Sequence, residues 1–208
     1  MKVGFIGLGA MGRHMARTLQ ASGNDMTVHD LRREAATHIL ESGAEWGDTP
    51  KEVALKSEVI FTSLPGPIDV ESVVLGPDGI TEGITTGQIY LDLSTNSPTV
   101  TRRLDKEMAD RGVAMLDVPV SGGVVGAEEG TLSMLVGGDE ALYDQMLPLL
   151  LQLGDKPFYC GPSGAGQVCK LVNNYISLSI QPLLAEAFTI GVKAGVDPAT
   201  IFEAVSRS

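Results

Sequence analysis

Cysteine is scarce in this sequence, and its two positions match no familiar ligand pattern. Cys160 and Cys169 are the only cysteines among 208 residues, and they form neither a Cys-x-x-Cys pair nor a metal-ligand cluster. This excludes a disulfide-stapled scaffold and gives no basis for a metal site. We therefore expect two free thiols in a reducing cytosol and no bound metal.

Positive charge is also scarce. Lys and Arg total 15 against 26 Asp and Glu, which gives a net charge of −11 and a pI near 4.6. Nucleic acids and anionic membranes are bound by basic surfaces, so neither is an expected partner. No apolar run is expected to reach the length of a membrane span, and the segment from Met1 to Ile6 lacks a signal-peptide layout. The expected protein is soluble and cytoplasmic.

Glycine, by contrast, is abundant, with 25 residues, and the first glycine cluster has a specific pattern. A buried strand is predicted over 2–6, and a helix is predicted over 11–20. Between them, Gly7 permits a tight turn, Gly9 lets the backbone approach a pyrophosphate, and Gly12 lets the helix pack closely on the strand. The phosphates are expected at the positive end of the helix. The candidate cofactor-binding loop consists of Gly7, Leu8, Gly9, Ala10, Met11 and Gly12.

An acidic residue closes the next predicted strand, which covers 26–29. Asp30 can accept hydrogen bonds from the adenosine ribose hydroxyls and repel a 2′-phosphate, which favours NAD over NADP. Arg32 and Arg33 follow directly, and arginine near this position is how such sites accommodate the 2′-phosphate. Alternatively, these arginines form a solvated first helical turn. The predicted cofactor is NAD, with NADP left open.

Strand and helix patterns then alternate along most of the chain. Further strands are predicted at 58–63, 88–93, 113–118, 131–136 and 157–160, with the strand at 131–136 added antiparallel. Helices are predicted at 31–42, 49–56, 68–75, 99–111, 140–151 and 165–194, and a last one starts at Pro198. Such alternation predicts an α/β fold, a Rossmann-type doubly wound and mainly parallel sheet followed by the start of an all-α second domain. Ligands are expected beyond the carboxyl ends of the strands, near Leu64, Pro65 and Thr95.

The segment after the strand at 113–118 is a candidate anion site. It contains Ser121, Gly122 and Gly123, where consecutive glycines allow backbone N–H groups to point inward and the serine hydroxyl adds a donor. A small carboxylate would suit such a nest. The alternative is a plain flexible turn.

A second glycine-rich turn, Gly161 to Gly166, leads into the long apolar helix at 165–194. Lys170, Asn173 and Asn174 are spaced i, i+3 and i+4, so they share one face of this helix. Around them the helix is apolar, and a buried lysine is costly without a partner or a task. Alternatively, the lysine reaches solvent along its aliphatic stem.

Together these motifs resemble the β-hydroxyacid dehydrogenase family, which includes 3-hydroxyisobutyrate dehydrogenase and tartronate semialdehyde reductase. The resemblance spans the whole chain. Phe5 to Gly12 is similar to the family's cofactor motif, Asp117 to Gly123 to its substrate motif, Gly164 to Asn174 to its catalytic motif, and Asp92 to Pro98 to a fourth signature.

The resemblance implies a role for each matching residue. It makes Lys170 the general acid/base and Asn174 the partner that orients the substrate oxygen, and it makes Ser121, Gly122 and Gly123 the carboxylate site. Thr95 is expected near the nicotinamide and the substrate, Leu64 and Pro65 along the cofactor, and Asn173 in the substrate-binding set. The implied reaction is hydride transfer between a nicotinamide and a small 3-hydroxy acid or its semialdehyde.

Departures from related families narrow this prediction. Asn173 stands where the 6-phosphogluconate dehydrogenases have a histidine, which disfavours decarboxylating sugar-phosphate chemistry. Imine reductases of the same fold usually replace the lysine that is retained here as Lys170. The alternatives are a non-catalytic dinucleotide-binding or assembly module, and a hydrolase using Ser94 or Ser121, although no Gly-x-Ser-x-Gly elbow is present.

The domain expectation is a dinucleotide-binding domain over 1–163, followed by a long interdomain helix and the beginning of a truncated all-α domain over 164–208. A chain of this extent is expected to bind cofactor even if it turns over poorly. Because the helix at 165–194 is apolar over much of its surface, we expect a homo-oligomer or a tendency to aggregate. The expected small-molecule partner is a hydroxy-carboxylate substrate.

Overall fold

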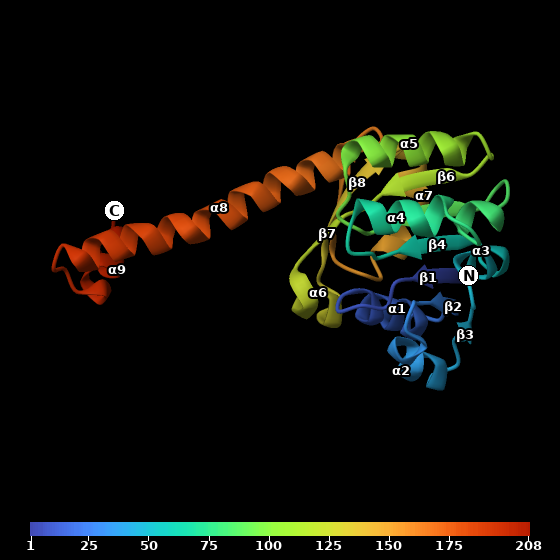
Figure 1. Cartoon of the computed structure of the whole chain (residues 1–208), viewed down its shortest axis with the longest axis horizontal. Helices are drawn as coiled ribbons and strands as arrows, with labels where there is room; N and C mark the ends of the chain where they lie inside the picture. The colour runs from blue at the N-terminus through green and yellow to red at the C-terminus, as the bar shows by residue number, and fades with distance from the viewer. The chain divides into compact units, whose positions relative to one another are not determined.

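A computed structural model describes all residues from Met1 to Ser208 and divides into two compact units, Met1–Lys170 and Leu171–Ser208. The first unit is built on one sheet with helices on both faces (Figure 1). Its strands are β1 (Lys2–Ile6), β2 (Asp25–His29), β3 (Glu45–Trp46), β4 (Val59–Thr62), β5 (Ile89–Asp92), β6 (Ala114–Asp117), β7 (Val120–Ser121), β8 (Ser133–Gly138) and β9 (Lys156–Gly161). The predicted α/β Rossmann-type class is confirmed.

The strand order is β3-β2-β1-β4-β5-β6-β8-β7, with β9 paired to β8. The six strands from β3 to β6 are parallel, β8 is antiparallel to β6 and β7, and β9 is parallel to β8. The chain therefore runs outward from β1 to β3 and then returns to place β4 on the other side of β1. This reversal opens a crevice beyond the carboxyl ends of β1 and β4, where ligands bind in such folds.

Two apolar cores hold helices against the two faces of the sheet. Phe5 and Phe61 belong to one core, whereas the neighbouring Ile6 and Ile60 belong to the other, as expected for side chains that alternate along a strand. The helices are α1 (Gly12–Ala21), η1 (Arg33–Ala36), α2 (Thr37–Glu41), α3 (Pro50–Lys56), α4 (Pro67–Leu75), η2 (Ile80–Glu82), α5 (Pro98–Ala109), α6 (Gly123–Glu129), α7 (Glu140–Leu150), α8 (Ala165–Lys193) and α9 (Pro198–Ser206). Residues of α1, α2, α6 and α7 enter the first core, and those of α3, α4 and α5 enter the second.

Several predicted elements are changed in the structure. The helix expected over 31–42 is a 3₁₀ turn, η1, followed by the short helix α2. The strand expected over 131–136 begins at Ser133 and extends to Gly138. The short strands β3 and β7 were not predicted, because two residues are too few to give a hydrophobic period. The helix α6 was not predicted, because the glycines around its start favoured a turn.

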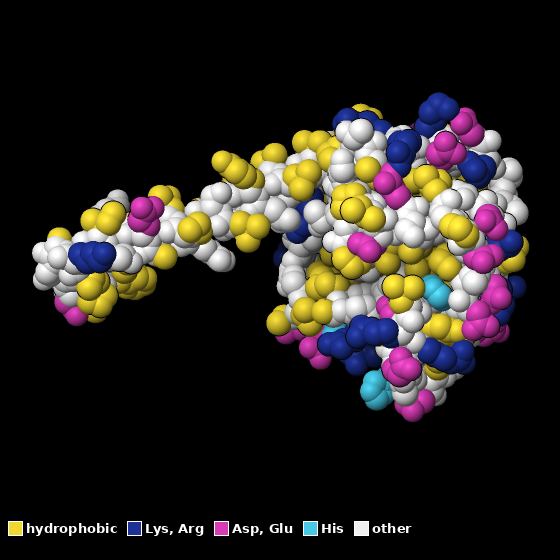
Figure 2. All heavy atoms as spheres, in the orientation of Figure 1, with side chains coloured by type: hydrophobic (Ala, Val, Ile, Leu, Met, Phe, Trp, Pro, Cys, Tyr) yellow, Lys and Arg dark blue, Asp and Glu magenta, His cyan; other side chains and the backbone are white.

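Helix α8 is longer than any other helix of the chain and is mostly apolar, and α9 follows it after a turn at Gly195. By length and composition alone it could cross a membrane, which corrects the expectation that no stretch reaches that length. The expectation was wrong because polar residues interrupt the apolar runs of α8, so no single run has the full length of the helix. Core helices of soluble proteins satisfy the same criterion, so the observation does not assign a membrane location. Figure 2 shows apolar side chains exposed along the second unit. Tyr175, Leu183 and Phe202 are among the exposed apolar residues of this unit.

Candidate functional site

Two of the three glycines in the first loop are required by the fold, and the third leaves open space. Gly7 has a φ of +95°, and a Cβ at Gly12 would overlap the carbonyl oxygen of Gly7, so the fold itself demands both glycines. Gly9 has no such constraint, because a Cβ placed there would have no heavy atom within 4 Å. The space beside Gly9 is therefore open, at the start of α1, where unpaired N–H groups favour an anion.

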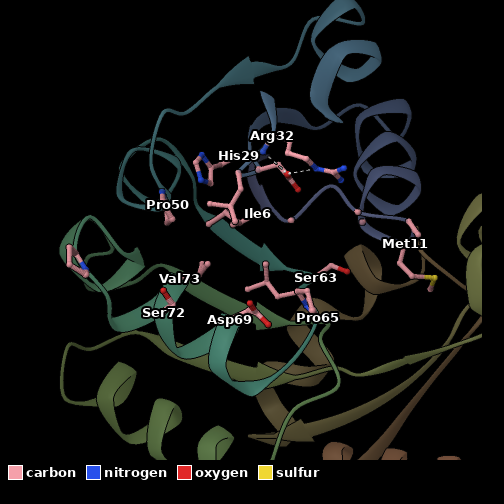
Figure 3. Close-up of a pocket in the computed structure, with 18 residues that line it drawn as sticks. Ile6, Met11, His29, Arg32, Pro50, Ser63, Pro65, Asp69, Ser72 and Val73 are labelled. Atoms are coloured by element: carbon pink, nitrogen blue, oxygen red, sulfur yellow. Dashed lines mark hydrogen bonds and ion pairs between the residues drawn. The ribbon is translucent and has the colours of Figure 1, made fainter. Parts of the chain in front are cut away.

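A cavity of about 640 Å³ adjoins this loop at the β1–β4 crevice (Figure 3). Of the predicted cofactor residues, Gly7, Gly9, Ala10, Met11, Gly12, Asp30, Leu64 and Pro65 line it, whereas Leu8 and Thr95 do not. Leu8 instead buries its side chain in the core, with 2% of its surface exposed. The volume, the glycine loop and the acidic residue at the end of β2 fit a dinucleotide.

Asp30 is held firmly at the end of β2. Its Oδ2 accepts the N–H of Leu8 at 2.7 Å, and its Oδ1 accepts the N–H of Arg32 at 2.9 Å. Leu8 thus contributes through its backbone, although its side chain is buried. The carboxylate keeps spare lone pairs, since each oxygen can accept more than one hydrogen bond.

The two arginines after Asp30 have separate surroundings. Arg32 lines the cavity and lies 4.0 Å from the Asp30 carboxylate, measured from Nε to Oδ1. Arg33 instead pairs with Asp48 at 3.7 Å and stacks over Trp46, with 5.0 Å from its guanidinium carbon to the ring centre. Only Arg32 is therefore placed to meet a ligand in this cavity.

The sequence analysis missed one wall of the cavity. On α4, Asp69, Ser72 and Val73 face the cavity, and their i, i+3, i+4 spacing is the signal that would have found them. His29 lines the opposite wall just before Asp30, and its Nδ1 lies 2.9 Å from the carbonyl oxygen of Gly47. Its position at the carboxyl end of β2 is the corresponding sequence signal.

Lys170 and Ser121, predicted from separate motifs, are brought together. Lys170 Nζ donates a hydrogen bond to Ser121 Oγ at 2.7 Å, and Lys170 is only 8% exposed. Burial lowers the pKa of this lysine, because the low-polarity surroundings disfavour the ammonium form. The lysine therefore does not reach solvent as a surface lysine does, and a serine hydroxyl is its partner.

The predicted glycine nest has a different form in the structure. Ser121 ends β7, Gly122 is the N-cap of α6 with a φ of +132°, and Gly123 is the first residue of that helix. The segment is therefore a strand-to-helix junction and not an open loop or a flexible turn. A short helix is favoured here because the chain must reverse between β7 and the antiparallel β8.

Thr95 lies in the loop between β5 and α5 and is partly exposed. Asn173 and Asn174 follow Lys170 on α8, with Asn174 one turn beyond the lysine. These last two residues belong to the second unit, and their predicted roles remain predictions.

Two buried carboxylates lie beneath the predicted catalytic motif. Asp117, 1% exposed, accepts the N–H of Gly164 at 2.7 Å and of Gln167 at 2.9 Å, and so caps the start of α8. Asp92 is fully buried and accepts bonds from Thr62 and Asn96. Desolvation raises the pKa of both carboxyl groups, against the opposing effect of these donors.

The fold, the glycine loop and the cavity define a dinucleotide-binding oxidoreductase domain, and comparison with known proteins agrees. A family model described as the NAD-binding domain of 6-phosphogluconate dehydrogenase matches residues 2–161. A second, described as the NAD-binding of NADP-dependent 3-hydroxyisobutyrate dehydrogenase, matches residues 164–208.

Individual relatives cover the whole chain. It is 39% identical to 2-(hydroxymethyl)glutarate dehydrogenase of Eubacterium barkeri over 100% of this chain and 69% of the relative. It is 38% identical to 3-hydroxyisobutyrate dehydrogenase of Pseudomonas aeruginosa over 99% of this chain and 69% of the relative. The structure of Mycobacterium tuberculosis 3-hydroxyisobutyrate dehydrogenase with L-serine matches with a TM-score of 0.91 and 30% identity, over 100% of this chain and 70% of that one.

The chain therefore belongs to the β-hydroxyacid dehydrogenase family of NAD(P)-dependent oxidoreductases, which act on the CH–OH group of small hydroxy acids. The predicted family, fold class and NAD(P) cofactor are confirmed.

Proposed function

We propose that this protein transfers a hydride between NAD and a small 3-hydroxy acid whose hydroxymethyl group is attached to the carbon next to a carboxylate. The observation that carries the proposal is the hydrogen bond between Lys170 Nζ and Ser121 Oγ, at the carboxyl edge of the sheet that also carries the dinucleotide cavity. The names of the relatives support the substrate class, since 2-(hydroxymethyl)glutarate, 3-hydroxyisobutyrate and L-serine all carry this hydroxymethyl group.

In this mechanism Lys170 moves the proton of the reacting oxygen. A nicotinamide supplies the hydride acceptor or donor when it is bound. During oxidation a neutral Lys170 accepts the alcohol proton, and the lowered pKa of its amine increases the neutral fraction. During reduction a protonated Lys170 donates to the carbonyl oxygen. Ser121, already hydrogen-bonded to Nζ, keeps the amine directed toward the junction between β7 and α6.

The substrate carboxylate is assigned to Ser121, Gly122 and Gly123. The first turn of α6 leaves backbone N–H groups without intrahelical acceptors beside the Ser121 hydroxyl. Thr95 and Asn173 are assigned to substrate contacts, and Asn174 to orienting the reacting oxygen from the turn of α8 beyond Lys170.

The alternative classes have less support. The candidate hydrolase nucleophiles have other partners, since Ser94 Oγ accepts the N–H of Leu64 and Ser121 Oγ accepts from Lys170. A non-catalytic module remains the alternative proposal. Titrating the purified chain with NADH and then assaying 3-hydroxy acids tests the difference, because NADH binding without any turnover would favour the non-catalytic module or a chain that is inactive alone.

We further propose that NAD is preferred over NADP because of the Asp30 carboxylate. The Asp30→Asn variant keeps the shape and an acceptor oxygen but removes the charge that repels a 2′-phosphate. We expect the ratio of the NADPH to the NADH dissociation constant to fall by about tenfold, measured by calorimetry. The matched control is Arg33→Ala, which is expected to leave the ratio unchanged because Arg33 pairs with Asp48. An unaltered ratio in Asp30→Asn would contradict the proposal.

We also propose a domain boundary near Gly164, where the strand–helix alternation gives way to the long apolar helix. A cytoplasmic location is proposed because the two cysteines are interpreted as free thiols in a reducing cytosol. We propose a homo-oligomer as well, because Leu171, Tyr175, Leu183 and Phe202 expose apolar surface in the second unit. Light scattering on the purified chain should report a mass of at least twice 21.9 kDa. A monodisperse monomer would contradict this proposal.

A further inference from the structure

Gln167 makes a two-point hydrogen-bonded clamp on the loop after β5. Its side chain is completely buried, its Nε2 donates to the carbonyl oxygen of Ser94 at 2.9 Å, and its Oε1 accepts the N–H of Asn96 at 2.8 Å. These partners determine the orientation of the side-chain amide, because the Ser94 carbonyl can only accept a hydrogen bond and the Asn96 N–H can only donate one. The two backbone groups flank Thr95, so the clamp determines where Thr95 lies.

The base of this clamp is itself rigid. The N–H of Gln167 donates to Asp117 Oδ2 at 2.9 Å, and the N–H of Gly164 donates to Asp117 Oδ1 at 2.7 Å. A Cβ at Gly166 would overlap the carbonyl oxygen of Leu135, so the first turn of α8 lies directly on β8. The backbone of Gln167 is therefore fixed, and its side chain holds the loop after β5 at a constant position.

The clamped loop is also tied to the cofactor crevice. Ser94 Oγ accepts the N–H of Leu64 at 2.9 Å, and Leu64 lines the cavity. Lys170 lies three residues after Gln167 on the same helix, one turn along. Gln167 thus connects the loop of Thr95 to the helix that carries the proposed acid/base.

We propose that Gln167 is a positioning residue, which holds Thr95 in register with Lys170 at the nicotinamide end of the cofactor site. This inference rests on the proposed function, because it takes Thr95 to lie beside the nicotinamide. Gln167 itself touches neither cofactor nor substrate in this role.

Two substitutions separate positioning from simple packing. Gln167→Met keeps the size of the side chain and removes both hydrogen bonds at every pH. Gln167→Glu restores both bonds only when its carboxyl is protonated, since the O–H then replaces the N–H that faces Ser94. When the new carboxyl group is ionised, it has no proton to donate, and one of its oxygens faces the carbonyl oxygen of Ser94 without a hydrogen bond. Burial raises the pKa of a carboxyl group, so protonation is expected at about pH 6 and ionisation at about pH 9.

The readout compares NADH with ADP-ribose, which lacks the nicotinamide. We expect wild type to bind NADH more tightly than ADP-ribose at both pH values, and Gln167→Met to lose this advantage by about tenfold while binding ADP-ribose normally. Gln167→Glu should match wild type at about pH 6 and Gln167→Met at about pH 9, reversibly. The other titratable groups nearby, Asp92, Asp117 and Lys170, are common to all three proteins, so wild type and Gln167→Met control for them.

The outcomes distinguish the inference from the function on which it rests. If wild type binds neither ligand, the proposed function and the positioning role both fail. If wild type binds both ligands equally, or if Gln167→Met weakens both equally or neither, only the positioning role is overturned. A Gln167→Glu protein whose NADH advantage does not change with pH also overturns it. The comparison of Gln167→Glu at the two pH values uses a single protein, so it tests the positioning role even if Gln167→Met fails to fold.

Discussion

Replacement of Lys170 with methionine should slow hydride transfer by about 10³-fold, the largest effect that we expect from any single substitution. Methionine retains most of the buried aliphatic length but has no proton to give or accept. The dissociation constant for NADH should stay within about twofold, because the cavity beside the glycine loop does not include Lys170. Steady-state rates with 3-hydroxy acids, together with NADH titration, measure the two effects separately.

The matched control is Lys156→Met, at a lysine whose side chain is 66% exposed and lies on the surface of the same unit. Its rate is expected to equal that of wild type. A Lys170→Met protein with undiminished turnover would show that the proton moves by another route, and the assigned role would then be wrong.

The pH dependence of the wild-type reaction gives an independent check on Lys170. Because burial lowers the pKa of the amine, oxidation should rise with pH through a midpoint below the ordinary value of 10.5, as the neutral base forms. Reduction should fall through the same range, since it needs the protonated amine. This dependence should be absent from the residual activity of Lys170→Met.

Gly12→Ala should lower the stability of the fold, whereas Gly9→Ala should lower the affinity for NADH, although the two glycines belong to one loop. In Gly12→Ala the new methyl group overlaps the carbonyl oxygen of Gly7, so the helix must shift from the strand. We expect a loss of about 3 kcal/mol in the free energy of unfolding. Thermal or urea unfolding without ligand measures it.

Gly9→Ala should leave the free energy of unfolding within about 1 kcal/mol, because the added methyl group meets no protein atom and Gly9 does not have a positive φ. The affinity for NADH should nevertheless fall by about tenfold or more, since the methyl group occupies the space that the pyrophosphate needs. Equal NADH affinity in Gly9→Ala and wild type would show that the phosphates do not approach this backbone.

The local sequence determined most of the first unit. Strand β1, the glycine loop and α1 were predicted because three patterns follow one another within a few residues. These are a buried apolar run, a glycine cluster that permits a tight turn and close packing, and a helical period. Lys170 was selected for a similar reason, since an apolar helix face does not usually carry a cation. The family resemblance gave Lys170 and Ser121 separate roles, and only the structure supplies the contact between them.

The tertiary structure decided what depends on contacts between distant segments. Sequence spacing left Arg32 and Arg33 equivalent, and only the packing of Trp46 and Asp48 against Arg33 separates them. For the start of α6 the sequence indicated a glycine nest or a flexible turn, whereas the antiparallel pairing of β7 with β8 places a reversal and a short helix there. The clamp of Gln167 on Ser94 and Asn96 has no sequence signal, because it joins a helix to a loop more than 70 residues earlier. Local patterns thus specify elements and candidate side chains, whereas partners far apart in sequence are specified only when the sheet brings the carboxyl ends of its strands together.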